Sequence, residues 1–503
     1  MMAAAPAAAL AAPSPAGGLG PACFRPLARG GFGDPLNAYA HSMEWFDGHL
    51  YVGTTRSNLC MMKVSRIHGT FDAWPVECPD YLYDQDMHAQ IWRLPADALA
   101  RAGDEDPAPG WASVYRAPDI VNAKGEALPR ELGYRCMAVF QGRSDPKPAL
   151  YVATYAPARG FGTHILRSLD GRSFETVPRP AGIDDGVITL RLLVAFKGRL
   201  FTAPTGRAGG APNLAGQALV YATEDPVNGS WDVANEPAFG DAGNLGVFEM
   251  AACGDWLYAG TGNLKGYQVW RTRAEGRPPF AWERVLVNGA HRGPTNQGVA
   301  SLCAHRGHLY VGSGIQHGGI DPGNKVGPAG PELVRIHEDG TWDLIVGFSR
   351  DTPEGYKPAL SGLLPGFGNF FAGYFWRMVS HDGWLYLGTF DWSLMLRFAT
   401  QGRWPRRFHA AITKVGLDAV FAQQAGADLH RSADGENWLT VTRDGFGNPY
   451  NYGIRTLVST PGGLSVGTVN PFAPKVAERL EGGGWAYRAN PDGGAEIWLG
   501  RRP

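Results

Sequence analysis

The sequence predicts an all-β fold, a seven-bladed β-propeller of four-stranded blades in which the N-terminal strand completes the last blade. Three observations predict it. A hairpin pattern recurs seven times, a third and a fourth apolar strand follow in phase, and the fourth strand missing from the last unit is found at the other end of the chain. Closing such a ring leaves no sheet edge exposed for other chains to pair with. We therefore expect one domain over residues 22–503.

The recurring hairpin consists of an apolar strand, a short turn with Gly or Asp, and a second strand resembling Leu-Tyr-Val-Gly-Thr. Its copies are HSMEWFDGHLYVGT around Met43, CMAVFQGRSDPKPALYVAT around Met137, RLLVAFKGRLFTA around Leu193, EMAACGDWLYAGT around Met250, SLCAHRGHLYVGS around Leu302, RMVSHDGWLYLGT around Met378 and TLVSTPGGLSVGT around Leu457. Short apolar runs joined by tight turns are typical of β-hairpins.

A third strand follows each hairpin, and a fourth strand begins with an aromatic residue. The third strands are QIWRL at Gln90, HILRS at His164, ALVYA at Ala218, QVWRT at Gln268, ELVRI at Glu332, DLHRS at Asp428 and EIWLG at Glu496. The fourth strands begin at Trp111, Phe174, Trp231, Trp282, Trp342 and Trp438. The segment FRPLARGGFGDP from Phe24 aligns with WLTVTRDGFGNP from Trp438, so we expect it to supply the seventh fourth strand.

Composition limits the classes of protein that this chain can belong to. Its length of 503 residues alone would suggest about three domains, but the repeat reduces them to one. The 69 Gly and 38 Pro supply the turns that a repeated hairpin needs. A net charge of −1 argues against a general binder of nucleic acid or anionic membranes. No apolar run reaches the ~20 residues of a membrane span, and we expect a monomer that binds a small molecule.

The N-terminus and the cysteines bear on location. Residues 1–21 are rich in Ala and Pro and carry no Lys or Arg, and Pro6 and Pro13 interrupt the apolar stretch, which favours a disordered leader over a signal peptide. The cysteines are Cys23, Cys60, Cys78, Cys136, Cys253 and Cys303, without the close pairing of metal ligands. We predict reduced thiols and a cytoplasmic protein, with secretion left open.

Two loops between third and fourth strands share a motif. They read Ser168-Leu-Asp170-Gly171-Arg-Ser-Phe174 and Ser432-Ala-Asp434-Gly435-Glu-Asn-Trp438, and Asp339-Gly340-Thr-Trp342 is a weaker copy. The motif resembles the Asp-box, or bacterial neuraminidase repeat, although the residue that the family usually has between Asp and Gly is absent here. The resemblance implies a structural loop in which the Asp caps backbone amides far from the active site. Sialidases, xyloglucanases and photosystem assembly factors share this loop, so it implies a fold and no particular function.

The loops that lead into the blades repeat a Gly-Phe-Gly-Asx motif and a later Asn. Their shared amide position is occupied by Asn37, Asn244, Asn296 and Asn451. Gly and Asx suit tight turns, so a structural role comes first. Two arrangements stay open: the amides bridge neighbouring blades, or they point into the channel mouth, where Asn451 would contact a ligand.

Cationic residues gather where the innermost strands begin. Four residues beyond that Asn, the blades read His41, Arg135, Arg191, Phe248, Ala300, Trp376 and Arg455, and Glu249 and Arg377 come one position later. A buried Arg is costly unless it is paired or liganded. One interpretation is an anion site in which Arg135, Arg191, Arg377 and Arg455 bind a carboxylate or phosphate. The other is pairing with acids of neighbouring blades: Glu249, Asp86, Asp428, Glu332 and Glu496.

Two insertions are expected to cover this channel mouth, at about residues 56–87 and 391–425. Long loops in compact domains are usually lids or binding loops. Apolar spacing predicts a helix over residues 408–421 in the second insertion. Aromatic residues on the same face, among them Tyr39 and Trp376, suit an amphiphilic or ring-bearing ligand with an acidic group, unless they serve only to pack the loops.

The candidates for acid–base catalysis are His41, His88, Asp86 and Glu249, because a general base must lie beside the bound substrate. No cofactor motif is found. A divalent metal held by His41, His88, His164 and His317 is a weaker alternative.

The leading hypothesis is an enzyme that acts on an anionic, amphiphilic or ring-bearing small molecule at the top of the channel, as a lyase, isomerase, cyclase or hydrolase. The first alternative is a non-catalytic binding or assembly module. The second is an Asp-box-type glycoside hydrolase, in which Asp86 and Glu249 would face each other across the cleft.

Overall fold

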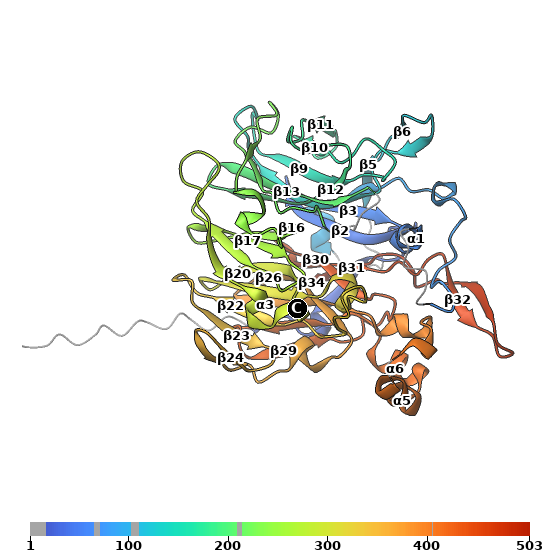
Figure 1. Ribbon diagram of the computed structural model, residues 1–503. Helices are drawn as coiled ribbons and strands as arrows, with labels where there is room; N and C mark the ends of the chain where they lie inside the picture. Colours follow the sequence, from blue (N-terminus) through green and yellow to red (C-terminus); the bar gives the residue numbers. More distant parts are fainter. Residues whose placement is uncertain (1–16, 65–70, 102–109, 209–213, 405, 503) are drawn as a thin grey trace, which may run out of the picture.

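The large β-sheet expected from the repeat dominates the protein. In the computed structural model, which describes residues 17–64, 71–101, 110–208, 214–404 and 406–502, 28 strands belong to one hydrogen-bonded sheet system. Their pairings are antiparallel. The all-β class is confirmed, because the described helices are short and lie in connecting loops (Figure 1).

The first two strands of each repeat form hairpins. The first strands are β2 (Asn37–Phe46), β8 (Gly133–Phe140), β12 (Val187–Phe196), β16 (Gly246–Cys253), β20 (Gly298–His305), β26 (Ala372–His381) and β30 (Gly453–Thr460). They pair with β3 (His49–Arg56), β9 (Ala149–Tyr155), β13 (Arg199–Arg207), β17 (Trp256–Gly262), β21 (His308–Gly314), β27 (Trp384–Asp391) and β31 (Gly463–Val469).

Two more strands extend each hairpin outward. The third strands are β4 (Gln90–Pro95), β10 (Ile165–Ser168), β14 (Tyr221–Thr223), β18 (Val269–Thr272), β22 (Leu333–Ile336), β28 (Leu429–Ser432) and β34 (Ile497–Gly500). Their outer neighbours are β5 (Ala112–Arg116), β11 (Glu175–Val177), β15 (Asp232–Val233), β19 (Glu283–Leu286), β23 (Trp342–Val346), β29 (Trp438–Thr442) and β1 (Phe24–Ala28).

The first strands contact one another in chain order, and the last of them contacts the first. β2 lies against β8, β8 against β12, β12 against β16, β16 against β20, β20 against β26, β26 against β30, and β30 against β2. The two ends of the chain meet in one sheet, because β1 pairs with β34 and places Phe24 opposite Gly500. β34 therefore pairs on one side with β31 of its own repeat and on the other with a strand from the opposite end of the chain.

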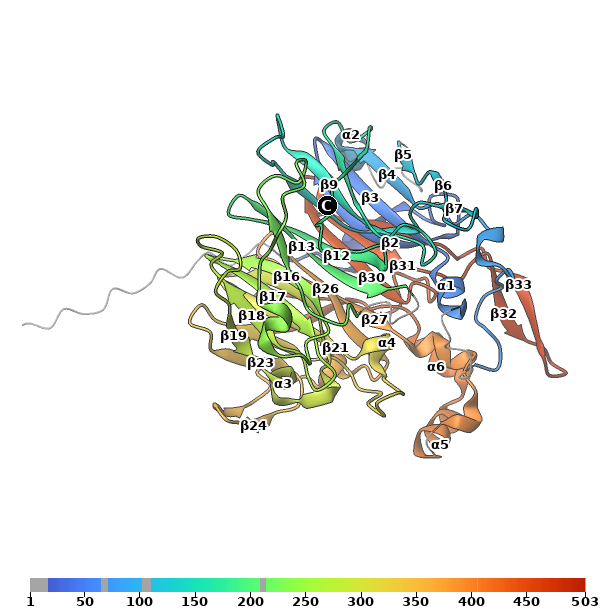
Figure 2. The same cartoon turned by 45° about the horizontal axis from the view of Figure 1, so that its top comes forward.

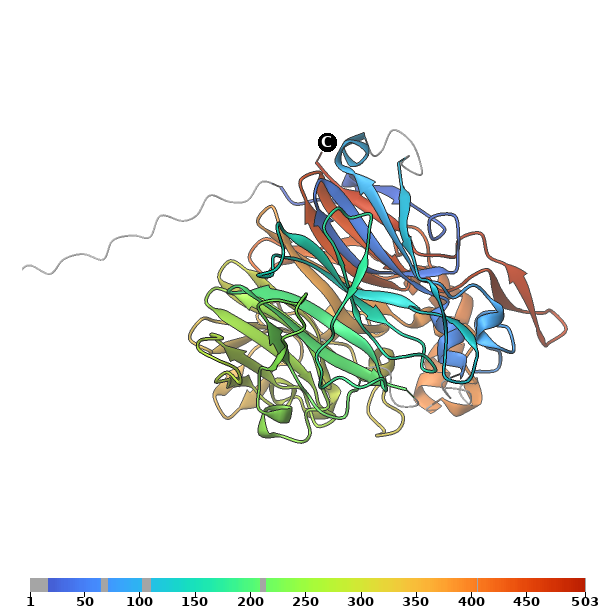
Figure 3. The same cartoon turned by 90° about the horizontal axis from the view of Figure 1, so that it is seen from above.

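Connections between second and third strands carry the longest insertions. The first contains α1 (Asn58–Val64) and the 3₁₀ turn η2 (Leu82–Asp84); the sixth contains η6 (Ser393–Arg397), η7 (Gln401–Arg403), α5 (Arg406–Val415) and α6 (Leu417–Gln424); the seventh contains the hairpin β32 (Lys475–Arg479)–β33 (Trp485–Ala489). These elements lie on one side of the sheets (Figures 1 and 2). The view from above agrees (Figure 3).

Shorter elements occupy other loops and turns. They are α2 (Ala96–Arg101), α3 (Asn288–His291), α4 (Gln316–Gly319), the hairpins β6 (Asp119–Val121)–β7 (Ala127–Pro129) and β24 (Arg350–Thr352)–β25 (Gly355–Lys357), and the 3₁₀ turns η1 (Pro21–Cys23), η3 (Pro237–Gly240), η4 (Gly293–Thr295) and η5 (Pro365–Gly368).

The single helix expected over residues 408–421 is instead two helices. α5 ends at Val415 and α6 begins at Leu417. Gly416 between them has φ +89°, a left-handed conformation that residues with a Cβ rarely adopt. The helical spacing of apolar residues therefore runs on through Gly416, although the helix itself is interrupted there.

The expectation that all cysteines are reduced is wrong for one pair. Cys60 and Cys78 form a disulfide across 18 residues of the first insertion. Both residues lie in the first insertion. The spacing between them matches no recognised metal-site or disulfide motif, so the sequence alone did not predict the pairing. Cys23, Cys136, Cys253 and Cys303 are free thiols.

The expected leader, residues 1–21, lies mostly outside the described residues, which begin at Gly17. Packing starts before residue 22, because Leu19 is 3 % exposed and its backbone N–H donates to the Tyr386 hydroxyl at 2.8 Å. Within the described ranges, no helix is both long enough and apolar enough to cross a lipid bilayer.

Candidate functional site

The candidate site starts from an irregularity that the first strands share. At one shared level, each has a residue that the ladder with its second strand skips: His41, Arg135, Arg191, Phe248, Ala300, Trp376 or Arg455. β2 and β26 each skip a second residue, Ala38 and Gly373. A β-bulge leaves such a residue unpaired and redirects its side chain. The positions aligned from the sequence are therefore bulge positions, and this explains why their side chains depart from the apolar alternation of a packed strand.

The arginines at these positions lie within electrostatic reach of one another. Burial lowers the pKa of Arg135 well below its ordinary value, and the charges of Arg191 and Arg455 lower it further. Burial, followed by the charges of Arg191 and Arg377, lowers the pKa of Arg455 to about 10. Arg455 is 5 % exposed. We call Arg135, Arg191, Arg377 and Arg455 the arginine cluster.

One carboxylate accompanies the arginine cluster. Glu249 Oε2 lies 3.4 Å from Arg377 Nη1, and Glu249 is 9 % exposed. Its charge also opposes the lowering of the Arg191 pKa by burial. The Arg191 Nε donates to the Phe248 carbonyl at 2.6 Å. Glu249 thus interacts with two of the four guanidinium groups, those of Arg377 and Arg191.

The other acids considered as partners have contacts elsewhere. Asp86 pairs with Arg56 and Arg116, Asp428 accepts from Asn369, Glu332 pairs with Arg292 and Arg350, and Glu496 accepts from Asn448 and Asn451. These acids therefore contact residues of the loops and strand ends around them, outside the arginine cluster. Of the acids proposed from the sequence, Glu249 forms an ion pair with Arg377 of the arginine cluster.

His41 lies next to the cluster in an uncharged state. It is 7 % exposed, and its Nδ1 is 2.6 Å from Thr55 Oγ1. Burial lowers its pKa well below the ordinary value, and the charges of Arg455, Arg135 and Arg191 lower it further. A neutral imidazole has a nitrogen that accepts a proton, as general-base catalysis requires.

Glu44 is a candidate that sequence reasoning missed. Burial raises its pKa to about 7, opposed by the Trp45 backbone N–H, which donates to Oε1 at 3.0 Å, and by the Arg377 charge. A carboxyl group that titrates near neutrality suits proton transfer. The available signal was its acidic side chain in a first strand that has no other Asp, Glu, Lys or Arg.

Aromatic side chains lie directly above this charged region. The Tyr39 ring centroid is 5.1 Å from that of His41 and 6.1 Å from that of Trp376. Arg455 lies over the Trp376 ring at 5.8 Å. The Tyr39 hydroxyl accepts a hydrogen bond from Asn58 Nδ2 at 3.2 Å, which ties it to α1. Burial, and then Tyr452, raise the pKa of Tyr39, so the phenol stays protonated.

The insertions cover these rings with one apolar cluster. This roof cluster has its buried members at Leu59, Cys60, Trp74, Val76, Leu82, Met87, Leu132, Phe390, Leu394, Phe398, Ala425, Tyr452, Val469, Phe472, Val476 and Ala477. Tyr39, Tyr374 and Trp376 pack against it. Single bridges tie the insertions together at Phe71 with Ala399 and Val76 with Val476. The first and sixth insertions thus pack together, and Tyr39, Tyr374 and Trp376 lie against the cluster that they form.

His88 and Asp86 belong to a different cluster. His88 Nδ1 is 2.6 Å from Asp86 Oδ1, and its Nε2 is 2.8 Å from Asp119 Oδ1. The pKa of Asp86 falls to about 2, because hydrogen bonds from His88 and the charges of Arg56 and Arg116 outweigh burial. Within the described ranges, the ion pairs of Asp86 and His88 join them to Arg56, Arg116 and Asp119 and not to the arginine cluster. Both ring nitrogens of His88 already face carboxylates.

Asn451 is held inside its own repeat. It is fully buried, and its Nδ2 donates to the Gly445 carbonyl at 2.9 Å and to Glu496 Oε2 at 2.8 Å. Its Oδ1 accepts from Thr468 at 3.0 Å. Asn37, Asn244 and Asn296 make corresponding contacts to the preceding loop and the third strand. These contacts fit neither of the two arrangements left open, because each amide binds the loop that leads into its own repeat and the third strand of that repeat.

Three of the four histidines considered for a metal have separate partners. His41 contacts Thr55, His88 contacts two aspartates, and His164 Nε2 lies 2.9 Å from Glu131 Oε1. The side chain of His317 lies outside the described part of the structure. Among the described residues, no group of three or more His, Cys, Asp or Glu side chains has a geometry that suits a metal ion.

The Asp residues of the repeated loops act as turn residues. Asp170 Oδ1 accepts from the backbone N–H of Arg172 and of Ser173, each at 2.8 Å. Asp434 Oδ1 accepts from Glu436 at 2.9 Å and Asn437 at 2.8 Å. These hydrogen bonds lower the pKa of Asp170 to about 2. Both carboxylates are occupied in shaping their turns.

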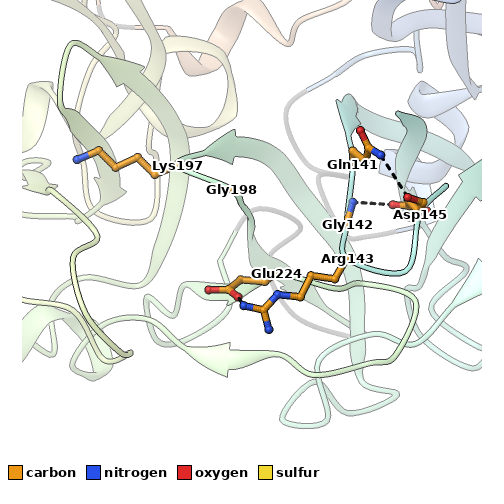
Figure 4. A pocket seen from close by; sticks show the side chains of 7 residues that line it. All are labelled: Gln141, Gly142, Arg143, Asp145, Lys197, Gly198 and Glu224. Carbon is orange, nitrogen blue, oxygen red and sulfur yellow. Dashed lines mark hydrogen bonds and ion pairs between the residues drawn. The ribbon is translucent and has the colours of Figure 1, made fainter. Parts of the chain in front are cut away.

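Two surface pockets lie away from the arginine cluster. The larger, about 530 Å³, is lined by Gln141, Gly142, Arg143, Asp145, Lys197, Gly198 and Glu224, at hairpin turns opposite the insertions. In Figure 4 Arg143 lies against Glu224, with which it forms an ion pair, whereas Lys197 points away. The other, about 360 Å³, includes His164 but none of the other nominated site residues.

Comparisons with known proteins identify no family. No protein-family model matches the chain, and no curated protein is detectably similar to it in sequence. Among solved structures, it is similar to the polysaccharide lyase Uly1 (11% identity, TM-score 0.41, covering 92% of this chain and 90% of that one) and a streptogramin B lyase (8%, 0.39, 94% and 96%). A third is the GH74 enzyme of Niastella koreensis (10%, 0.37, 92% and 74%). Similarity at this level supports no conclusion about the activity of this chain.

Proposed function

We propose that the chain is a seven-bladed β-propeller whose first strands line a central channel. Each blade would consist of a first, second, third and fourth strand, with β1 completing the blade of β30, β31 and β34. The support is the order of strand pairings and the cyclic contacts from β2 through β30 back to β2. The Asp-box resemblance of the Asp170 and Asp434 loops belongs to the same proposal.

Within this fold we propose an enzyme that acts on an anionic, amphiphilic or ring-bearing small molecule. The observation that carries the proposal is the arginine cluster, in which buried guanidinium groups lower one another's pKa. An anion bound there would offset that repulsion, and Arg can bind carboxylate or phosphate in a bidentate manner. Tyr39 and Trp376 would contact the ring or apolar part of the ligand.

The chemistry would be proton transfer in a lyase, isomerase, cyclase or hydrolase reaction. His41, neutral beside the cluster, would accept a proton from the bound molecule, while the guanidinium groups stabilise the negative charge that develops. Glu44, whose pKa of about 7 leaves part of it protonated near neutrality, would donate a proton to the product, and His41 would later pass its proton back. Glu249, a carboxylate paired with Arg377, would hold that arginine in place. Asp86 and His88 have no part in this proposal, because their partners lie in a separate ion-pair network.

A binding experiment tests the proposal. Calorimetry with benzoate and with inorganic phosphate as probes should show binding to the wild type, and Arg135→Met or Arg455→Met should weaken it at least about tenfold, the worth of one charge-assisted hydrogen bond. The matched control is Arg172→Met, which removes an exposed arginine of a turn. Failure of both probes to bind the folded wild type would contradict an anion site.

A non-catalytic binding or assembly module is the second candidate. The observation that favours it is a set of exposed apolar side chains on the loops, including Phe348, Tyr356 and Phe370. This candidate predicts that anions bind, that no bound compound undergoes acid–base chemistry, and that His41→Gln leaves the affinity unchanged. These results together would favour the binding module over the enzyme. A glycoside hydrolase has weaker support, since Asp86 and Glu249 belong to separate clusters.

A further inference from the structure

Exposed apolar side chains are distributed unevenly over the molecule. Of the described residues, fourteen large apolar ones are exposed, and two of these, Val233 and Leu439, lie on outer strands. The other twelve are Tyr81, Val121, Phe161, Ile320, Phe348, Tyr356, Leu360, Leu364, Phe370, Val415, Leu480 and Tyr487. All twelve lie in second-to-third-strand connections or in connections between one repeat and the next, which begin and end at the same end of the sheets. The connection with Tyr356 and Leu360 folds back along β23, where Lys357 Nζ donates to the Trp342 carbonyl.

Two elements project from that end. The α5–α6 pair and the β32–β33 hairpin stand out from the sheets on the same side (Figures 1 and 2). Val415, at the end of α5, is 56 % exposed, and Leu480 and Tyr487 of the hairpin are 40 % and 37 % exposed. Water-exposed apolar side chains at the tips of projecting elements are typical of surfaces that dock on something else.

The sixth insertion also carries a local positive charge. Between Trp392 and Ala425 the sequence has five Lys or Arg and a single acidic residue, Asp418, although the whole chain has a net charge of −1. On α5, Arg406, Arg407 and Lys414 are exposed, whereas Ile412 is buried against the insertion. The balanced total therefore hides a basic helix on the face that carries the exposed apolar residues.

Aromatic rings lie beside these basic groups. Phe370 is 45 % exposed, and its ring is 5.7 Å from Phe408 of α5 and 5.6 Å from Trp392. Trp404 packs against Phe408 at 5.3 Å. A short helix with Lys and Arg on its exposed face and aromatic side chains at its edge is the composition of interfacial helices that lie on lipid headgroups.

We propose that the face carrying the insertions docks on an anionic lipid surface, with α5 and Phe370 at the contact. The basic side chains of α5 bind the headgroups, and Phe370 and Val415 enter the headgroup region. The exposed apolar side chains lie on several separate loops. A lipid surface can deform to contact all of them, whereas a rigid protein partner would need one matching pocket for each. This inference goes beyond the proposed function and does not depend on it.

Vesicle sedimentation of the full chain tests the inference. The protein should sediment with vesicles of phosphatidylcholine mixed with phosphatidylglycerol and not with phosphatidylcholine alone. The triple variant Arg406→Gln/Arg407→Gln/Lys414→Gln should bind the mixed vesicles about a hundredfold more weakly, because each lost basic residue near an anionic membrane costs about fivefold. The matched control, Arg172→Gln/Lys197→Gln/Arg306→Gln, removes three exposed basic residues from turns at the opposite end and should bind like the wild type.

A second variant distinguishes a lipid surface from an acidic protein. Phe370→Ser should weaken vesicle binding and leave binding to soluble poly-glutamate unchanged. Equal sedimentation of the α5 triple variant and the wild type would overturn the inference. The inference would also be overturned if the protein did not sediment with the mixed vesicles. A third contrary result is binding to poly-glutamate that is as tight as binding to vesicles, with no effect of Phe370→Ser. That result would identify the face as a docking site for acidic proteins.

Discussion

At the scale of single residues, a bulge at one level of each first strand decides which side chains meet. The skipped positions bring Arg135, Arg191 and Arg455 within electrostatic reach of one another. In a regular strand, successive side chains point to opposite faces of the sheet, where they pack against the neighbouring sheets. The bulges thus allow charged residues in strands whose other positions pack the apolar core.

Replacing one arginine of the cluster should separate its contribution to stability from its contribution to binding. Arg455→Met keeps most of the side-chain volume and removes a buried charge whose pKa is lowered to about 10 by burial, Arg191 and Arg377. We expect the free energy of unfolding to rise by about 1–2 kcal/mol, measured by urea denaturation, while anion affinity falls. A variant less stable than the wild type by a similar amount would show that Arg455 has a structural partner instead.

Alignment of the repeats predicts which residues occupy the bulge level, because the level is a fixed distance from the turn motif. It does not predict the bulges, which arise from pairing geometry between two strands. Asn451 illustrates the difference: its type fits a ligand contact, but its donors bind Gly445 and Glu496. Glu44 was missed because a single acidic residue in a strand has no motif to mark it.

At the scale of elements, the sixth insertion begins and ends on acidic residues. Asp391 ends β27 and Asp428 precedes β28, and both are almost fully buried. Asn369 Nδ2 donates to Asp391 Oδ2 at 2.9 Å and to Asp428 Oδ2 at 3.3 Å. In the repeat of β30 the position of Asp391 is taken by Asn470, which donates to the Asp492 carbonyl. The sixth repeat thus places a second carboxyl group where that repeat has an amide.

Asp391→Asn should remove a pH dependence of stability. Burial, followed by the charge of Asp428, raises the pKa of Asp391 to about 7, so its contribution to stability is full below the unfolded pKa and is lost as pH rises through 7. Relative to Asp391→Asn, the wild type should lose on the order of 4 kcal/mol between pH 4 and pH 9, measured by urea denaturation. The exposed Asp255→Asn is the control. A constant difference across this pH range would contradict the prediction.

The disulfide should hold the first insertion against the roof cluster. Cys60→Ser/Cys78→Ser removes a cross-link that closes 18 residues, which in the chain-entropy account lowers stability by about 3 kcal/mol. Thermal unfolding followed by circular dichroism measures the loss, with Cys23→Ser as the control for a free thiol. If the double variant unfolds at the temperature of the wild type, the cross-link adds nothing to the fold.

At the scale of the whole molecule, the closed order of first strands and the meeting of β1 with β34 are the main features. The hairpin periodicity predicts both, since each repeat is a local pattern and the missing strand has a recognisable counterpart at Phe24. What periodicity does not predict is how insertions from distant repeats pack together. The roof cluster joins residues near 74, 398 and 476, and contacts between such distant loops leave no local pattern in the sequence.

Removing the N-terminal strand should expose a sheet edge. A variant that begins after Ala28 leaves β34 paired on one side only, with β31. An unpaired edge invites association with other chains, so we expect aggregation at concentrations where the wild type stays dispersed, measured by light scattering. A truncated protein that stays dispersed and keeps the thermal midpoint of the wild type would contradict the closing role of β1.

The central claim is that the arginine cluster binds an anion, and a crystal soaked with 4-iodobenzoate tests it most directly. Anomalous scattering from iodine should place the probe below Tyr39 and Trp376, with its carboxylate within hydrogen-bond distance of guanidinium groups of Arg135, Arg191 or Arg455. A crystal in which the probe binds only elsewhere, while the cluster residues bond to protein groups alone, would contradict the claim.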